Sequence, residues 1–329
     1  MTIECHQLTE NVLVEGGFEF GHREDTPAAW HKKGVKIPTD LAGDAWGFSS
    51  HAGVAWGIKM VPYRVIRGLP EVCELADCFG QYIIRDDGDK RHLATVGSKW
   101  TPHQWVDSCR NLQVLLDTGR CRMSTVGSLS GGTTIFASLE FHKMEVRTGD
   151  VVTSHFHHVV RNEYASNFTG IWDLRMVCRN TVSRGMAAAS SAMRIRHGRD
   201  VTLNVKTAID AINVESETFA RKVEGWQKLA QVSLAPSDIR DYVQKVFDVD
   251  PSKEEVSTKL GNQLDKVVNM ALFGMGNNGS SLWDAFNGVT QFLSHESGHN
   301  ANTRTESLWF GSAGKRLERA AEIAAEMAS

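Results

Sequence analysis

Arginine side chains gather in one short stretch of this chain and are its most suggestive group for binding chemistry. From residue 175 the sequence reads RMVCRNTVSRGMAAASSAMRIRHGRD, and it contains no acidic residue before Asp200. A planar guanidinium binds a phosphate through two hydrogen bonds and stacks on bases, whereas a lysine ammonium is a point charge. The stretch therefore predicts a nucleic-acid-binding surface. Its expected members are Arg175, Arg179, Asn180, Arg184, Arg194, Arg196 and Arg199.

A helix start is expected inside this stretch. Asn180 is suited to cap a helix that runs through the alanine-rich residues 187 to 192 to Met193. The amino end of that helix would direct free amides and a positive dipole toward Arg175 and Arg179, which is a favourable place for an anion. The other interpretation is that Arg175 and Arg179 pair with acidic residues of the helical region, while the other arginines cover a solvated helix.

A second group with chemical potential is the sequence H-E-x-x-H formed by His295, Glu296 and His299. On one helix this spacing presents two imidazoles to zinc, with the glutamate as general base. Ser297 and Gly298 in the middle, and the polar residues that follow, are typical of a helix end that leaves for a loop. We therefore predict an exposed cluster at a helix end, and a metal-dependent hydrolase at this cluster is the alternative function.

Three more histidines lie in an expected strand. Strand alternation would place His155 and His157 on one face, His158 on the other, and Phe156 in the core. Two histidines on one face suit a metal, but no third ligand can be assigned from the sequence. A nucleophile elbow, a phosphate-binding loop and a deaminase signature are absent from the sequence, and SLSGGTT at residue 128 reads as a hairpin turn. We assign no catalytic residue, no metal ligand and no cofactor.

Composition places these groups in an ordinary folded protein. The chain has 329 residues, is 41% hydrophobic and carries a net charge of −3, so the arginine stretch is a local departure from a mildly acidic background. Its six cysteines are scattered, which favours free thiols in a reducing compartment. No apolar stretch approaches the roughly 20 residues that span a bilayer. These features predict a cytoplasmic protein without a membrane partner.

The elements that must position these residues change in kind along the chain. We expect an irregular wrapping segment over residues 1–70, an antiparallel α+β core over 71–200 and a helical domain over 201–329. The core should hold a hairpin over 81–97, a helix capped by Thr101 and Gln104, and an antiparallel meander from residue 121 to 178. The fold class is therefore α+β, an antiparallel β-meander with flanking helices in the first two thirds, followed by a helical region. The helices of that region are expected at 205–234, 237–247, 254–273, 282–293 and 313–327.

RMVCRNT at residue 175 resembles the signature of a phage and plasmid family called domain of unknown function 932. VGSKWTPHQ at residue 96, LWDAFNGVTQFLSH at 282 and LWFGSAGK at 308 follow in the order of that family, and the resemblance covers roughly residues 25 to 325. The chain departs from the family pattern at residues 286–291 and at 164–167, where relatives have an Asp-Gly pair. The resemblance implies a phage, prophage or plasmid setting, and therefore a bacterial host cell, and implies no activity.

The arginine stretch, the curved meander and this resemblance predict a nucleic-acid-binding protein of a phage or other mobile element rather than an enzyme. The expected partner is single-stranded DNA, bound or annealed during replication or recombination. A host-interaction module with an acidic protein partner is a further alternative, because both partners are polyanionic. The sequence leaves self-association open.

Overall fold

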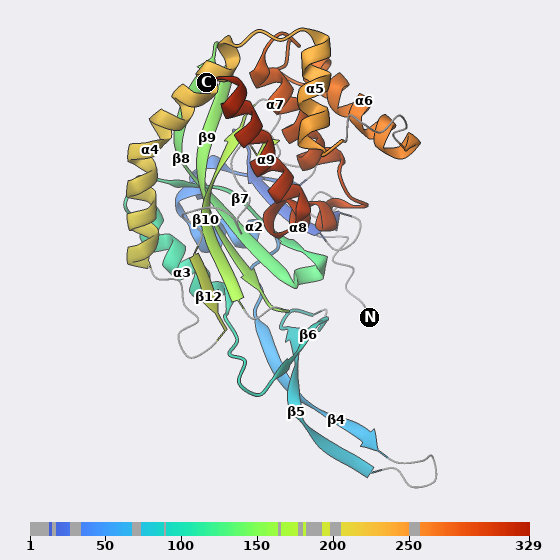
Figure 1. Cartoon of the computed structure of the whole chain (residues 1–329). Helices are drawn as coiled ribbons and strands as arrows, with labels where there is room; N and C mark the ends of the chain where they lie inside the picture. The colour runs from blue at the N-terminus through green and yellow to red at the C-terminus, as the bar shows by residue number, and fades with distance from the viewer. Residues whose placement is uncertain are drawn as a thin grey trace.

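The computed structural model describes residues 13–14, 18–26, 34–67, 74–88, 90–163, 166–176, 180–181, 193–197, 205–249 and 257–329. Over these residues the chain forms a curved main sheet with helices on both faces and a smaller sheet that projects from one end (Figure 1). The α+β fold class is confirmed, with sheets in the first part of the chain and helices in the last.

The main sheet has nine strands among the described residues, in the order β1-β2-β7-β8-β9-β10-β11, with β3 beside β2 and β12 beside β10. All neighbours are antiparallel except β2 and β3. The predicted meander is confirmed in β7 to β10. The strands are β1 (Leu13–Val14), β2 (Phe18–Arg23), β3 (Val35–Ile37), β7 (Arg122–Leu129), β8 (Thr134–Arg147), β9 (Asp150–Arg161), β10 (Ser166–Arg175), β11 (Asn180–Thr181) and β12 (Met193–Arg196).

The turn between β7 and β8 confirms the hairpin predicted for SLSGGTT. Its one-turn helix, Ser130–Gly132, contains Gly131 at φ 70° and Gly132 at φ 105°. A Cβ atom on Gly132 would lie 2.6 Å from the Trp56 ring, so this turn requires glycine both for its backbone and for its space.

The small sheet joins β4 (Ile58–Arg67), β5 (Glu74–Arg85) and β6 (His92–Gly97), which confirms the hairpin expected over 81–97. It is anchored to the main sheet by the buried Arg85, whose Nη1 donates to Glu19 Oε1 on β2 at 2.9 Å. The guanidinium also lies 4.2 Å from the centroid of the Trp56 ring. The described part of the first 70 residues forms short elements, of which β2 pairs with β7 inside the main sheet and β4 pairs with β5.

One face of the main sheet packs against α2 (Ala45–His51), α3 (Trp105–Leu116) and the first half of α4 (Val205–Gln231). Asp44 caps α2 by accepting from the Gly47 amide at 2.9 Å, after the one-turn helix Thr39–Gly43. The apolar side of α3 is buried as its spacing predicts, but its start differs. Its N-cap is Gln104 without a side-chain cap bond, so the predicted Thr101 cap is wrong.

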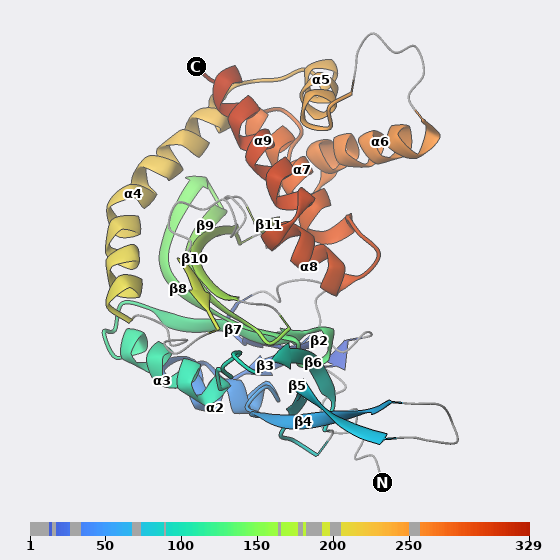
Figure 2. The same ribbon diagram turned by 60° about the horizontal axis from the view of Figure 1, so that its bottom comes forward.

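The opposite face packs against the helices of the last third of the chain. Figure 2 shows the sheet curving around α7, α8 and α9, with α4 along its outer side. The predicted helices are confirmed, and α8 is an addition in a region that the sequence suggested was a loop. The helices are α5 (Pro236–Val246), α6 (Thr258–Phe273), α7 (Leu282–Gln291), the π-helix Phe292–Glu296, α8 (Ala301–Phe310) and α9 (Ser312–Met327).

Burial on both faces makes the meander the centre of the molecule. Every residue of β9 is buried except Val151. One hydrophobic cluster joins Phe136 and Trp172 of the sheet to Trp309 and other residues of α5 to α9. The sheet and the helical region therefore share a core, and the division at residues 70 and 200 stays a prediction.

Candidate nucleic-acid interface

Arg175, expected at a phosphate, is instead a buried structural residue at the end of β10. Its side chain is 0% exposed, and it binds Asp150 through two hydrogen bonds, Nε to Oδ1 at 2.6 Å and Nη2 to Oδ2 at 2.5 Å. The guanidinium also donates to Asn277 Oδ1 at 2.8 Å and to the Gly276 carbonyl at 2.7 Å. A guanidinium whose donors are engaged by the protein in this way has no room for a phosphate.

Neighbouring groups extend this cluster between the sheet and the loop that precedes α7. Trp283 Nε1 donates to Asp150 Oδ2 at 2.9 Å, and Arg147 Nη2 donates to Asp284 Oδ1 at 2.6 Å. Asp284 also caps α7 together with Ser281. We call the cluster the sheet–helix latch, and it consists of Arg147, Asp150, Arg175, Asn277, Trp283 and Asp284.

The local structure after Arg175 also differs from the prediction. Asn180 lies in β11, paired with Arg175, so it does not cap a helix, and Met193 lies in β12 rather than at a helix end. The anion site predicted at that helix start is therefore wrong. Arg179, Arg184 and Arg199 lie outside the described residues, and Arg196 belongs to β12.

Arg194 is the one arginine of the stretch whose side chain is both described and exposed. β12 runs antiparallel to β10 with Arg194 opposite Phe168, which brings the guanidinium carbon 5.9 Å from the centroid of the Phe168 ring. Arg194 Nε donates to Ser166 Oγ at 2.8 Å. Only one nitrogen of the fork is used in that bond, and the chain therefore presents a guanidinium held at its base and exposed at its tip.

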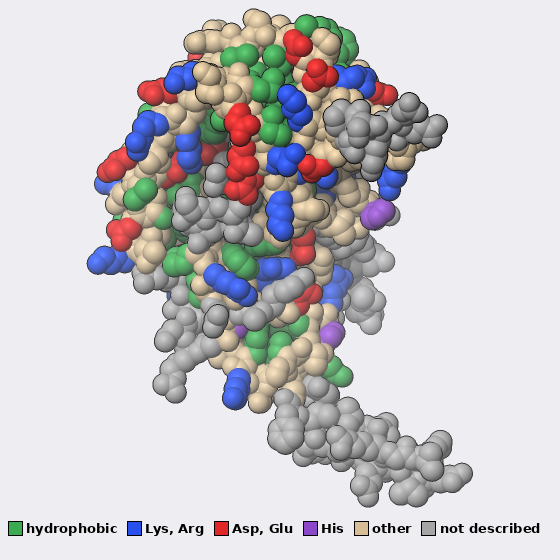
Figure 3. Space-filling view, viewed as in Figure 1, with side chains coloured by type: hydrophobic (Ala, Val, Ile, Leu, Met, Phe, Trp, Pro, Cys, Tyr) green, Lys and Arg blue, Asp and Glu red, His purple; other side chains and the backbone are tan. Residues whose placement is uncertain are grey.

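A second guanidinium, that of Arg161, lies close to the Phe168 ring and to the ring of Phe310. Arg161 at the end of β9 places its guanidinium carbon 4.3 Å from the centroid of Phe310 and 6.0 Å from that of Phe168. The two rings are 4.8 Å apart. The ion pair between Arg161 and Glu306 is long, at 3.8 Å, and burial raises the pKa of the Glu306 carboxyl. We call Arg161, Phe168, Arg194 and Phe310 the Arg194 patch. Figure 3 shows Lys and Arg side chains mixed with acidic ones over the face of the molecule that it draws.

The far end of β12 is tied to the segment that leads into α3. The His197 ring stacks on Trp100 with centroids 4.5 Å apart, and its Nδ1 lies 3.0 Å from the Thr101 carbonyl oxygen. Its Nε2 lies 2.9 Å from Asn167 Oδ1. Burial lowers the pKa of His197, against the opposite effect of the Thr101 and Arg161 backbone carbonyls. These contacts fix the position of β12 relative to α3.

The histidines of β9 follow the predicted alternation. His155 and His157 lie on one face, where the His157 ring is 4.2 Å from that of Trp172 and 6.5 Å from that of Trp309 in α8, whereas His158 faces α3. Ser108 Oγ lies 2.7 Å from both His103 Nε2 and His158 Nε2, an arrangement that resembles a nucleophile with its base. Ser108 is 0% exposed, so a substrate cannot reach it. Burial lowers the pKa of His103 to about 4 and of His158 to about 3, which makes both rings neutral structural groups.

The geometry that H-E-x-x-H requires is absent. His295 and Glu296 end a π-helix, and Ser297 is extended, so His299 does not follow on the same helical face. Glu296 pairs with Lys266 at 2.6 Å. Across the described part of the chain, no three His, Cys, Asp or Glu side chains are placed to hold a metal ion. The zinc geometry of this motif is therefore not formed among the described residues, and Glu296 and His299 are exposed at a helix end as predicted.

A buried acidic pair fastens α4 to the sheet. Lys222 Nζ contacts Glu215 Oε1 at 2.6 Å and Asp173 Oδ2 at 3.2 Å, and Ser154 donates to Asp173 at 2.5 Å. Burial raises the pKa of Asp173 to about 6, although Lys222 opposes the shift. Asp173 is 0% exposed, and its contacts make it a structural residue.

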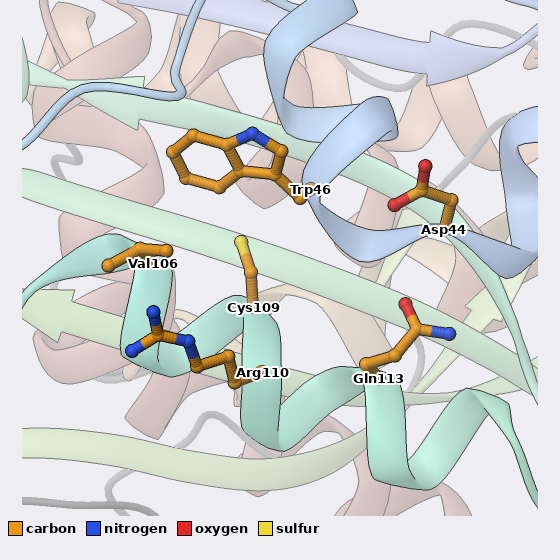
Figure 4. A pocket seen from close by; sticks show the side chains of 6 residues that line it. All are labelled: Asp44, Trp46, Val106, Cys109, Arg110 and Gln113. Atoms are coloured by element: carbon orange, nitrogen blue, oxygen red, sulfur yellow. The ribbon is translucent and has the colours of Figure 1, made fainter.

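A surface pocket that the sequence did not suggest lies between α2 and α3, with a volume of 460 Å³ (Figure 4). Its lining residues are Asp44, Trp46, Val106, Cys109, Arg110 and Gln113. The sequence contained one indication of this pocket, a helical pattern in residues 45–51. Ala45, Phe48 and Ser49 form the buried side of α2, and Trp46 does not belong to that side.

Comparison with known proteins assigns a family. A family model described as domain of unknown function (DUF932) matches residues 92–320, which span β6 to most of α9. No curated protein and no solved structure matches the chain. None of the helices in the described ranges is long and apolar enough to cross a membrane.

Proposed function

The chain belongs to the family called domain of unknown function 932, and from that premise we propose that it binds nucleic acid, preferring single-stranded DNA, through the Arg194 patch. The observation that carries the proposal is the exposed guanidinium of Arg194 above the Phe168 ring at the end of the main sheet. We further propose that it acts in the replication or recombination of a phage or other mobile element, the setting that the sequence resemblance implies.

Electrostatics and stacking support this choice of ligand. A phosphate accepts hydrogen bonds from the outer nitrogens of an arginine fork, and the buried charge of Arg161 adds to the positive potential beneath it. The exposed Arg194 guanidinium above the partly exposed Phe168 ring offers a plane on which a base can stack, and only an unpaired strand presents its bases in this way. Arg196 and Arg199, which the sequence adds to the basic stretch, would supply further phosphate contacts.

The test is fluorescence anisotropy of nuclease-treated protein with labelled single-stranded DNA, duplex DNA and RNA over a salt series. We expect the logarithm of the affinity to fall linearly with the logarithm of the salt concentration. Of the three nucleic acids, single-stranded DNA should bind most tightly. Arg194→Ala should reduce the magnitude of that slope by about 0.7, the value for one phosphate of a single strand. Arg221→Ala, which removes an exposed arginine of α4, is the matched control and should leave the slope unchanged.

Two outcomes would contradict the proposal at different levels. Absence of binding by the unaltered protein at low salt would reject nucleic-acid binding itself. Binding that is unaffected when Arg194, Arg196 and Arg199 are all replaced by alanine would reject the assignment of these arginines.

A further inference from the structure

We propose that the pocket between α2 and α3 binds one unpaired base of a nucleic-acid strand, between the Trp46 indole and the Arg110 guanidinium. This inference rests on the proposed function and adds to it a second, base-binding site. Figure 4 shows the Trp46 ring on the α2 side, Arg110 on the α3 side and the Cys109 thiol between the two helices.

The first argument is the exposure of Trp46. Its side chain is 42% exposed, although the neighbouring Ala45 and Phe48 of the same short helix are fully buried. Phe48 and Ala45 already supply the packing of α2 on the sheet, so the indole is not needed there. A large exposed aromatic ring at the edge of a pocket is suited to stack on another flat ring.

The second argument is the chemistry of the opposite wall. The Arg110 side chain is 72% exposed and pairs with Asp107 on the same helix, an interaction weak enough to exchange for a ligand. A guanidinium stacks on a base and pairs with its phosphate, so one residue suits both halves of a nucleotide. Cys109 contributes an apolar floor, since burial raises the pKa of its thiol to about 12.

The third argument is that hydrogen bonds between α2 and α3 hold the pocket open. Gln113 Oε1 accepts from the Ala45 amide at 3.0 Å, and its Nε2 donates to the Gly43 carbonyl at 2.9 Å. Asp44 is engaged at the N-terminus of α2, where it caps the Gly47 amide. Figure 4 places Asp44 and Gln113 toward one end of the pocket and Trp46, Val106 and Arg110 toward the other, which leaves the apolar and cationic end for a base and its phosphate.

The segment that leads into α3 contacts the residue that follows β12, the strand that carries Arg194. His197, which follows β12, stacks on Trp100 and contacts Thr101, and α3 begins shortly afterwards at Trp105. A strand that leaves Arg194 along β12 would reach α3 by way of the Trp100 and His197 rings.

The test measures binding of a labelled single-stranded oligonucleotide that contains 2-aminopurine, whose fluorescence is quenched when it stacks. With the unaltered protein we expect quenching on binding. Trp46→Ala should lower the affinity about tenfold and relieve part of the quenching. Arg110→Lys, which keeps the charge and loses the plane, should weaken stacking more than Val114→Ala, which removes an exposed apolar group elsewhere on α3.

The outcomes separate this inference from the proposed function. If the unaltered protein binds no oligonucleotide, both fail. If it binds and Trp46→Ala and Arg110→Ala bind with the same affinity and quenching as the unaltered protein, the pocket assignment fails alone. Competition by an aromatic peptide, without competition by deoxynucleoside monophosphates, would assign the pocket to a protein side chain and overturn the proposal.

Discussion

Arg175 and Arg194 belong to the same basic stretch of sequence but lie in regions of opposite character. Arg175 is enclosed in the sheet–helix latch and bound to Asp150, whereas Arg194 is exposed at the end of the sheet and donates its Nε to Ser166. Partners distant in sequence account for the difference. Asp150 and Asn277 both accept hydrogen bonds from Arg175, whereas the Arg194 side chain is exposed to solvent. A run of like charges therefore does not imply one surface.

The strongest way to break this comparison is to replace Arg175 by methionine. Loss of the guanidinium leaves the buried Asp150 carboxylate without its main partner, and we expect the free energy of unfolding to fall by about 3 to 5 kcal/mol. Denaturation by urea, followed by circular dichroism, measures the change. A double variant, Arg175→Met with Asp150→Leu, should recover part of the loss because no isolated charge is then buried. Unfolding of Arg175→Met at the same urea concentration as the unaltered protein would contradict a structural role.

An intermediate effect is expected from His103, which is buried close to His197 at the end of β12. Its pKa is lowered to about 4, so the folded state stays neutral where the unfolded chain takes up a proton. The stability that it contributes is complete above pH 6.5 and is lost as the pH falls toward 4, by about 3 kcal/mol. His103→Gln should therefore flatten the dependence of unfolding free energy on pH in that range.

Asp173 provides the control of opposite sign. Its pKa is raised to about 6, so the folded state binds its proton more tightly and stability falls as the pH rises from about 4 to 6. Asp173→Asn should consequently change the slope in the direction opposite to His103→Gln. Equal slopes in both variants and in the unaltered protein would show that neither group is coupled to folding.

The smallest effect is expected at Arg194, the exposed member of the comparison with Arg175. Arg194→Met, the substitution used at Arg175, should change the free energy of unfolding by no more than about 0.5 kcal/mol, because the side chain is exposed and its loss leaves no buried charge. The same urea titration measures it. A loss close to that of Arg175→Met would mean that Arg194 is a structural residue, and it would remove the patch from the proposed function.

The sequence predicted elements whose signals are local. Alternation gave the meander and the opposite faces of His157 and His158, and helical spacing gave α3 to α7 and α9. It did not predict α8, because Asn300 and the polar residues after it resemble a loop, although Asn300 and Thr303 form a capping box. Asn180 has the residue type of a helix cap and therefore predicted a helix, but it lies in the strand β11.

Contacts between distant residues account for what could not be predicted. β2 pairs with β7, so that Gly21 lies opposite Val126, and no pattern within the first 70 residues indicates that partner. Burial of Arg175 depends in the same way on Asn277, which belongs to the helical region. The pocket forms where α2 packs against α3. The sequence around Trp46 shows a helical pattern for α2, but it does not show that α3 is the helix against which α2 packs.

The two-sided burial of β9 has a consequence for the tolerance of the chain to change. A strand with one solvated face offers every second position to variation, but β9 is covered by α3 and α4 on one side and by α8 on the other. It is also rich in polar groups, among them His155, His157 and His158, each of which is buried in a specific environment. In a library of all single substitutions, we therefore expect β9 to appear as an almost unbroken block of intolerant positions, interrupted only near Val151.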